Sequence, residues 1–321
     1  MVEEQKPTVA FLGPEGSYTH QAALDAFPPS TNQVSLTPEI TIEDVFSAVQ
    51  SGTAHRGVVP FENSSNGSVV FTLDLFADLT NKYPDILVCG EAYVHVKHCL
   101  LGYYYSSSNP ATDEDGKEAP DYSSIKKLYS HPQAWGQCTK FLTRHLKTAE
   151  RHDVSSTSKA AEIASKDKSG ESAALSSFIA AELFGLDVLA KEINDVKGNS
   201  TRFFVIRKRD DKTPSTGSTE ESSLDGDNWK SLVTFTVEHS NLGALANCLT
   251  VFSSHGINLT SINTRPSGVR NWNYVFFVEF KGRKTEDGEG EVDAALRELD
   301  KVCRGWRWLG SWENRLIEEQ G

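Results

Sequence analysis

The chain has 321 residues, of which 38% are hydrophobic and 24% charged, and its formal net charge at pH 7 is −12. This length predicts two or three domains around a sizeable core, and the acidic balance disfavours binding to nucleic acid. No apolar run is long enough to cross a bilayer, and the N-terminal stretch "MVEEQKPTVA" has the features of neither a secretory signal nor a transit peptide. We therefore expect a cytoplasmic protein with no membrane partner.

The cysteine pattern indicates a reducing compartment and no metal site. The five cysteines are odd in number and form no CxxC pair, which disfavours both a disulfide framework and a structural zinc site. If the substrate is an anion, local groups must attract it against the net negative charge of the chain.

Strands and helices alternate along the first 103 residues. Residues 8–27 read as a strand, a glycine turn and a helix, and Thr41 with Asp44 resembles a capping box at the start of a second helix. Residues 56–67 read as a strand followed by a polar turn, after which a helix and a long extended segment follow. This alternation predicts an α/β unit with mostly parallel strands.

The same alternation resumes after a polar interruption. Residues 105–124 hold two prolines and a run of charges, so we expect a solvated surface insertion. Residues 125–130 then read as a strand. Three helices are predicted after it, over residues 132–146, 157–167 and 172–185, the last ending at Gly185.

The C-terminal part is predicted to be a separate small domain. Residues 209–228 hold a single large apolar residue, Leu224, and are typical of a linker. Residues 229–317 read as strand, helix, two strands, helix and strand, which is the βαββαβ order of a ferredoxin-like sandwich. That order alone does not name a ligand.

Four polar motifs follow strands of the α/β body. Each has an ordinary explanation: a βα turn, a helix cap, a structural histidine, and a strand start with a solvated arginine. Ligands of parallel α/β sheets bind at the carboxyl ends of the strands, so one shared cleft explains four such motifs better than coincidence. The first motif lacks the GxGxxG spacing, so it does not indicate a dinucleotide-binding site. The motifs are "GPEGSY" (13–18), "PFENSSNG" (60–67), "SHPQAWGQC" (130–138) and "NSTR" (199–202).

Together these motifs resemble the prephenate dehydratase family joined to a C-terminal ACT domain. The matching segments include "FLGPEGSYTHQAA", "VVPFENSSNGSV", "SHPQAWGQC", "NSTRFFVI" and, near the C-terminus, "GALANCL" and "INLTSINTRPS". The resemblance implies an α/β two-lobed catalytic domain (7–208) like a periplasmic binding protein, with the active site between the lobes. A linker (209–228) and an α+β ferredoxin-like ACT domain (229–317) would follow.

The resemblance also implies a reaction and its participants. The family removes water and carbon dioxide from prephenate to give phenylpyruvate, on the route to phenylalanine, and phenylalanine commonly inhibits through the ACT domain. The reaction would need no metal or organic cofactor, because aromatisation of the ring supplies the driving force. Members are usually homodimers or homotetramers.

The family's "TRF" signature assigns activity to Thr201, whose hydroxyl could donate a hydrogen bond to the leaving oxygen. Arg202 could hold a carboxylate, although strand alternation can instead point it away from Thr201. The other catalytic residues implied are Glu62, Asn63 and Gln137. The substrate-binding residues implied beside Arg202 are Ser17, Tyr18, Ser64, His131 and Gln133.

Phenylalanine would bind two motifs of the ACT domain. One is the intact "GAL" loop, and the other is a strand where this chain has "NTRP" in place of the typical "ESRP". This departure makes phenylalanine binding a less direct inference than catalysis. The residues implied are Leu242, Gly243, Ala244, Leu245, Asn263, Thr264, Arg265 and Pro266.

Three other hypotheses stay open at this point. Arogenate dehydratase would act on the amino-acid form of the same ring, and the missing transit segment favours prephenate without deciding specificity. A non-catalytic amino-acid sensor could share both folds, but it would not need to keep the donor Thr201. A periplasmic solute receptor would need a signal peptide.

Overall fold

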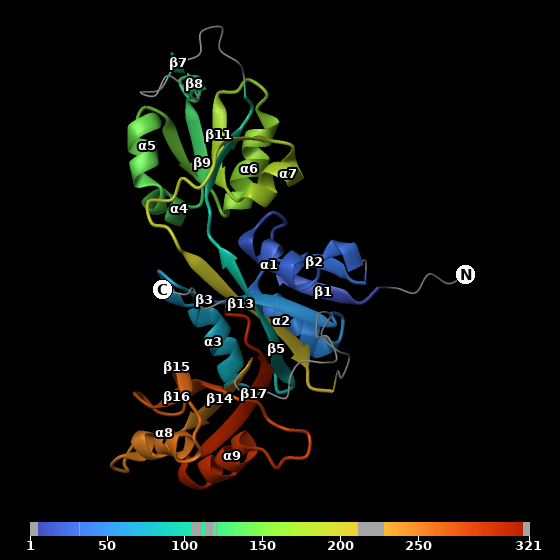
Figure 1. The fold of residues 1–321 in the computed structure, drawn as a ribbon, viewed down its shortest axis with the longest axis vertical. Helices are drawn as coiled ribbons and strands as arrows, with labels where there is room; N and C mark the ends of the chain where they lie inside the picture. The colour runs from blue at the N-terminus through green and yellow to red at the C-terminus, as the bar shows by residue number, and fades with distance from the viewer. Residues whose placement is uncertain are drawn as a thin grey trace, which may run out of the picture. The chain divides into compact units, whose positions relative to one another are not determined.

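The computed structural model describes residues 6–31, 33–104, 111–112, 118–119, 121–210 and 228–316 (Figure 1). The chain divides into two compact units. The first unit is built from residues 1–12, 22–93 and 202–321, and the second unit from residues 13–21 and 94–201. None of the helices in the described residues combines the length and apolar character that crossing a membrane requires.

A mixed sheet forms the centre of the first unit. Its strands lie in the order β2-β1-β3-β13-β5, with β4 paired to β3, and β1 runs parallel to both β2 and β3. The strands are β1 (Thr8–Leu12), β2 (Ser35–Glu39), β3 (Arg56–Asn63), β4 (Gly67–Ser68), β5 (Ile86–His95) and β13 (Ser200–Lys208). The helices before β5 are α1 (Tyr18–Ala26), the short η1 (Pro29–Thr31), α2 (Ile42–Ser51) and α3 (Val70–Ala77).

The predicted capping box starts α2. The Thr41 hydroxyl accepts the Asp44 backbone N–H at 3.1 Å, and the Asp44 carboxylate accepts the Thr41 backbone N–H at 3.0 Å, which satisfies two otherwise unpaired donors. The helix then packs closely on β3 at Gly57, where a Cβ atom would lie 2.7 Å from Cγ1 of Val45. A glycine is therefore required at this crossing.

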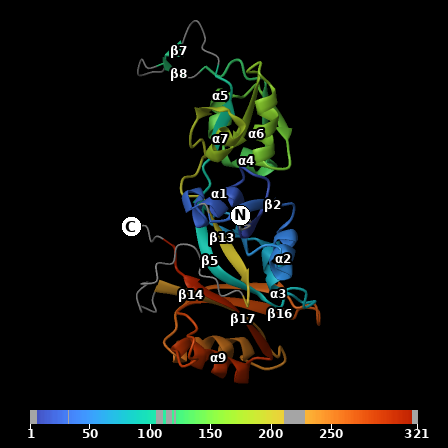
Figure 2. The same cartoon turned by 90° about the vertical axis from the view of Figure 1, so that its right-hand side faces the viewer.

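The C-terminal domain has the βαββαβ order predicted from the sequence. Its antiparallel sheet runs β15-β16-β14-β17, and helices α8 and α9 cover one face (Figure 2). The elements are β14 (Trp229–Thr236), α8 (Ala244–Ser254), β15 (Leu259–Pro266), β16 (Tyr274–Lys281), α9 (Glu291–Val302) and β17 (Gly305–Glu313).

The other face of this C-terminal sheet packs on the first unit's own sheet. Leu232, Phe277 and Trp312 share one core cluster with Phe61 and Phe204. Contact is close enough that a Cβ atom on Gly310 would lie 2.0 Å from the carbonyl oxygen of Val88. Because both faces of β14 and β16 are covered, the C-terminal domain belongs to the first unit and does not form a compact unit of its own.

The second unit has a sheet in the order β10-β9-β11-β6-β12. β9, β10 and β11 are parallel, whereas β6 runs antiparallel to both of its neighbours. The strands are β6 (Cys99–Gly102), β9 (Lys127–Ser130), β10 (Glu150–Asp153), β11 (Ser172–Ser176) and β12 (Asp187–Ala190). The helices are α4 (Pro132–Gln137), α5 (Thr139–His145), α6 (Thr157–Lys166) and α7 (Phe178–Phe184).

Two element predictions in the second unit are wrong. The helix predicted over 132–146 is broken at Cys138, whose ψ of 26° is not helical, so that α4 and α5 are separate. The helix predicted over 172–185 begins with a fully buried strand, β11, and only its second half is helical. Alanine-rich sequence favours a helix, but a central place in the sheet overrides that preference. Gly185 does end α7, in the left-handed conformation with φ 62°.

Two predicted segments lie largely outside the described residues. In the predicted insertion, the described parts include β7 (Ala111–Thr112) and β8 (Glu118–Ala119), which pair antiparallel. Of the predicted linker, the structure describes only its first two residues and Asn228.

Candidate functional site

A hydrogen-bonded chain of three side chains lies at one end of the second unit's sheet. The Tyr18 hydroxyl lies 3.1 Å from Nδ1 of His98, and Nε2 of the same ring lies 2.7 Å from Oε1 of Gln137. An amide oxygen can only accept, so Nε2 of His98 carries the proton and Nδ1 of the neutral ring accepts the tyrosine hydroxyl. This order turns the amide nitrogen of Gln137, a donor, away from the histidine.

Burial keeps the hydrogen-bonded side chains of Tyr18 and His98 neutral. His98 is 3% exposed, and burial lowers the pKa of its imidazole although the hydrogen bond to Gln137 acts in the opposite direction. Burial likewise raises the pKa of the Tyr18 hydroxyl. Both groups therefore hold their protons in one arrangement across the neutral pH range.

The segment that leads to Thr201 is bonded to the same place. Asn199 accepts the Val96 N–H at its backbone carbonyl (2.8 Å), and Asn194 accepts the His98 N–H at its side chain (2.7 Å). The Asp195 N–H donates to the backbone carbonyl of Gln137 at 2.7 Å. Residues 194–199 are thus held against both His98 and the end of α4. Thr201 itself is half-buried near the start of β13.

The glycine turn of residues 13–17 is held by serines of the second unit. Ser158 donates to the carbonyl of Glu15, and Ser177 donates to the carbonyl of Gly16 at 2.8 Å. Ser17 accepts the His20 N–H at 3.2 Å and so caps α1. The turn therefore has a structural role, and the Tyr18 hydroxyl lies against His98. Substrate binding by Ser17 and Tyr18 stays a prediction.

His131 has the ordinary role that its neighbourhood predicts. Its Nδ1 accepts the Gln133 N–H at 3.3 Å, which makes it the N-cap of α4. Gln133 is exposed on the first turn of that short helix and Gln137 is half-buried at its end. Contact of His131 or Gln133 with a substrate stays a prediction.

In the first unit, the "ENSSN" motif forms a hairpin turn. Glu62 and Asn63 are the last residues of β3, and the Asn63 side-chain carbonyl accepts the N–H groups of Ser65 and Asn66, both at 3.0 Å. Asn63 itself is half-buried, and the next residue, Ser64, is exposed. The polar motif predicted at the end of this strand is therefore a hairpin turn.

The surroundings of Arg202 favour a structural role over the predicted binding of substrate. Its guanidinium donates to the Glu91 carboxylate at 2.9 and 2.5 Å and lies 2.6 Å from a carboxylate oxygen of Glu279. It is 8% exposed, because strand alternation puts it on the same face of β13 as the core residues Phe204 and Ile206. Both of its acidic partners belong to the first unit, so its positive charge is neutralised inside the protein.

The residues predicted to bind phenylalanine fall into two environments. Leu242 is 100% exposed, and Gly243 begins α8 in the left-handed conformation with φ 74°. On β15 the side chains alternate: Asn263 accepts the Ser68 hydroxyl at 2.6 Å, and Arg265 pairs with Asp74 on α3 at 2.5 Å. The remaining members are Ala244 and Leu245 on α8 and the outward-facing Thr264 and Pro266 on β15. Their role in binding an effector stays a prediction.

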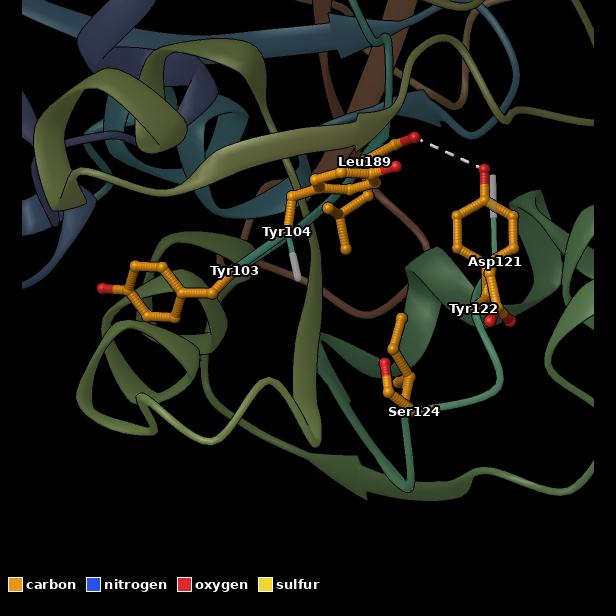
Figure 3. A pocket seen from close by; sticks show the side chains of 7 residues that line it. Tyr103, Tyr104, Asp121, Tyr122, Ser124 and Leu189 are labelled. Carbon is orange, nitrogen blue, oxygen red and sulfur yellow. Dashed lines mark hydrogen bonds between the residues drawn. The ribbon is translucent and has the colours of Figure 1, made fainter. Parts of the chain in front are cut away.

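A hollow in the second unit lies elsewhere. Figure 3 shows Tyr103, Tyr104, Tyr122 and Leu189 around it, with the Tyr122 hydroxyl donating to the Leu189 carbonyl at 3.3 Å. None of the residues predicted to be functional lines this hollow. Among the described residues, no cluster of histidine, cysteine, aspartate or glutamate has the arrangement that would hold a metal ion.

Sequence reasoning missed His98, Glu91 and Glu279. His98 lies inside the extended run predicted over 85–103, where it is one of several polar residues. Glu91 and Glu279 each interrupt a strand that is otherwise buried. A buried carboxylate requires a cationic partner, so each of the two acids indicates a buried cation without identifying which one.

Comparisons with known proteins identify the family. The family described as "PDT: Prephenate dehydratase" matches residues 9–211. A "Bifunctional chorismate mutase/prephenate dehydratase" of Aquifex aeolicus is 38% identical over 316 residues, which cover 98% of this chain and 76% of that protein.

Two solved structures are similar over almost the whole chain. A prephenate dehydratase of Arthrobacter aurescens in complex with L-Phe has a TM-score of 0.74 and 29% identity, covering 96% of this chain and 90% of that one. A structure described as a novel type of quorum-quenching acylase has the same TM-score of 0.74 with 25% identity, covering 96% and 98% of the two chains. The predicted fold class, α/β lobes followed by a ferredoxin-like domain, is confirmed.

Proposed function

The chain belongs to the prephenate dehydratase family, and from this premise we propose that it converts prephenate to phenylpyruvate in phenylalanine biosynthesis, as a carbon–oxygen lyase of the cytoplasm. The observation that supports this best is the ordered chain from Tyr18 through His98 to Gln137. It presents an amide donor beside the segment that leads to Thr201, and donors are what the departure of an oxygen anion requires.

The reaction needs few groups because its bonds rearrange together. The bond between the ring and its carboxylate breaks, and its electron pair moves into the ring as carbon dioxide leaves. The bond from the opposite ring carbon to its hydroxyl breaks at the same time, and the oxygen leaves as water once it has gained a proton. Departure as hydroxide is costly, so hydrogen bonds that strengthen as charge develops on this oxygen lower the barrier.

The residues are assigned to these needs by their chemistry. The Thr201 hydroxyl donates to the leaving oxygen, and the Gln137 amide nitrogen is a second donor. Asn63 supplies an amide from the hairpin turn, and Glu62 orients it. Because a threonine hydroxyl is a weak acid, we assign it hydrogen-bond stabilisation and not full proton transfer. Ser17, Ser64, His131 and Gln133 are left as candidate donors to the two carboxylates of prephenate.

The regulatory half of the proposal concerns residues 229–317, which we propose to be an ACT domain that follows the catalytic part at 7–208 and the linker at 209–228. The Arthrobacter aurescens protein was solved with L-Phe, and here the motifs at 242–245 and 263–266 would receive that ligand. The exposed Leu242 and Ile262 suit an association surface, in line with a homodimer or homotetramer. Feedback inhibition by phenylalanine follows from this assignment.

The proposal is tested by phenylpyruvate formation with the purified chain. Prephenate and arogenate are supplied in parallel, each with and without phenylalanine. We expect turnover of prephenate that phenylalanine suppresses. Turnover of arogenate alone would change the substrate and keep the chemistry. Absence of turnover with phenylalanine still bound would make this a sensor and overturn the catalytic assignment.

A further inference from the structure

Four charged side chains are buried together where the C-terminal domain packs on the first unit's sheet. We call them the buried charge cluster: Glu91 on β5, Arg202 on β13, Lys230 on β14 and Glu279 on β16. Two belong to the central sheet of the first unit, and two belong to the C-terminal domain. Their exposed fractions are 1%, 8%, 4% and 2%, in the order given.

The cluster is closed and balanced. Arg202 contacts both acids, at 2.5 Å to Glu91 and 2.6 Å to Glu279, while Lys230 lies 3.3 Å from Glu91 and 4.0 Å from Glu279. Glu91 also accepts the backbone N–H of Arg315 at 2.8 Å. With two cations and two anions the cluster has no charge to offer a ligand, so its partners lie within the protein.

Aromatic rings complete the enclosure of Arg202. Its guanidinium carbon lies 4.9 Å from the centre of the Phe204 ring and 5.9 Å from that of Trp312, which belongs to β17. Arg202 is therefore held by the Glu279 carboxylate and the Trp312 ring, which both belong to the C-terminal domain. Buried ion clusters of this kind are costly to form compared with apolar packing, and what they supply is a defined geometry.

The position of Arg202 in the chain gives this geometry its importance. Arg202 directly follows Thr201, and the chain passes from the second unit to the first between these two residues. A peptide bond transmits the placement of one residue to the next, since only two soft dihedral angles separate them. Whatever fixes Arg202 thus restricts where Thr201 can stand.

We propose that Glu279 and Lys230 of the C-terminal domain are positioning residues for Thr201, acting through Arg202 and Glu91. The C-terminal domain thereby completes the framework of the candidate site, and a ligand that shifts β14 or β16 changes turnover through the same four side chains. This inference rests on the proposed function for the reaction and goes beyond it in naming the connection.

Two other contacts between the same parts serve as comparisons. Arg307 on β17 donates to the backbone carbonyls of Tyr83, Pro84 and Ile86 at 2.6 to 3.2 Å, and Arg265 pairs with Asp74. The carbonyl partners of Arg307 lie at the start of β5 or before it, and its ion-pair partner among the described residues is Asp78, which is not a member of the buried charge cluster. Losing Arg307 should weaken the packing of the C-terminal domain without touching Arg202.

The experiment compares Glu279→Gln, Arg307→Lys and the double variant Glu279→Gln/Lys230→Gln with the unchanged full chain. For each we measure kcat and KM for prephenate, the phenylalanine concentration that halves the rate, and the unfolding temperature. Removing one charge leaves the cluster unbalanced, whereas the double variant keeps the Arg202–Glu91 pair and restores balance. It therefore separates a lost connection from a misfolded chain.

We expect Glu279→Gln to lower kcat and to raise the half-inhibiting phenylalanine concentration by about 2- to 30-fold, with little change in KM. The double variant should recover unfolding temperature and not the phenylalanine response. Arg307→Lys should lower the unfolding temperature alone. Loss of stability in Glu279→Gln with kcat and inhibition unchanged would overturn the proposal, as would an equal kinetic effect of Arg307→Lys. Failure of the unchanged chain to turn over prephenate would instead refute the proposed function.

Discussion

Two buried polar clusters of this protein differ in whether they keep a polar group that a ligand could contact. The hydrogen-bonded series Tyr18–His98–Gln137 in the second unit is neutral and ends in a half-buried amide, whose nitrogen has no hydrogen-bond partner among the described residues. The buried charge cluster in the first unit is ionic and closed, with each cation facing an anion inside the protein. An open neutral cluster can contact a substrate, whereas a closed ionic one acts only on the residues that it holds.

This difference divides one short motif between two tasks. Thr201 and Arg202 are neighbours in "TRF", yet strand alternation sends their side chains to opposite faces of β13. The arginine enters the core, whereas we propose that the threonine takes part in the reaction. Adjacent residues of one signature therefore need not share a function, and the following predictions test the division from its largest expected effect to its smallest.

Replacing Thr201 by alanine should have the largest effect on turnover. Loss of one preorganised donor to a developing oxygen anion lowers kcat by about 10²–10³, and the half-buried side chain contributes little to packing. Steady-state kinetics with prephenate would measure the change, and Thr201→Ser, which keeps the hydroxyl, should recover most of the rate. Near-normal turnover in the alanine variant would remove Thr201 from the mechanism.

Replacing Arg202 by methionine should have its main effect on stability. The change leaves Glu91 and Glu279 with Lys230 as their only cationic partner in the buried charge cluster, and breaking a buried ion pair costs about 3–5 kcal/mol. Denaturant unfolding followed by fluorescence would measure the free energy of unfolding. A stability equal to that of the unchanged chain would show that the cluster contributes nothing to the fold.

Replacing His98 should have a smaller effect, which depends on whether the new side chain can still orient Gln137. Glutamine reaches as far as the imidazole Nε2 and can donate to Gln137, whereas asparagine is too short. We expect His98→Asn to lower kcat more than His98→Gln, by about the worth of one neutral hydrogen bond, ~1 kcal/mol or roughly fivefold. In a Gln137→Ala background the two variants should be equal, because His98 then has nothing to orient.

Equal losses in both backgrounds would mean that His98 acts on packing and not through Gln137. The control is the comparison of the two His98 variants in the otherwise unchanged chain. Gln137→Ala alone must also lower kcat. If that variant kept full activity, the amide donor would have no part in the reaction.

The smallest prediction concerns pH. Burial lowers the pKa of His98 below its ordinary value of 6.5, so the unfolded chain takes up this proton first as the pH falls. The stability that His98 contributes is therefore complete above pH 6.5 and declines below it, by at most ~1.4 kcal/mol per pH unit. Unfolding curves between pH 8 and about 5.5 should show a shallower decline for His98→Gln than for the unchanged chain.

Much of the fold was predictable because local signals agree with the tertiary structure. The capping box at Thr41, the C-cap at Gly185 and the βαββαβ order all follow from side-chain chemistry and spacing. The buried strand β11 was mistaken for a helix because its serines and alanines carry no β signal. Only its neighbours β9 and β6, which are distant in the sequence, make it a strand.

The candidate site was predictable in its parts and not in its connections. The "ENSSN" turn and Thr201 are visible as polar residues at strand ends. His98 became visible only through contacts with residues 80 positions before it and 39 positions after it. Arg202 was ambiguous for a physical reason: a cation at a strand start is equally suited to solvent, to a ligand or to a buried acid, and Glu91 lies 111 residues away.

The division of "TRF" is tested most directly by measuring kcat and the free energy of unfolding for Thr201→Ala and Arg202→Met in one set of assays. The account predicts opposite patterns: the threonine variant loses turnover and keeps its stability, whereas the arginine variant loses about 3–5 kcal/mol of stability and the molecules that remain folded keep more turnover than Thr201→Ala. If the arginine variant were fully stable and as inactive as the threonine variant, Arg202 would belong to the chemistry and the division would be wrong.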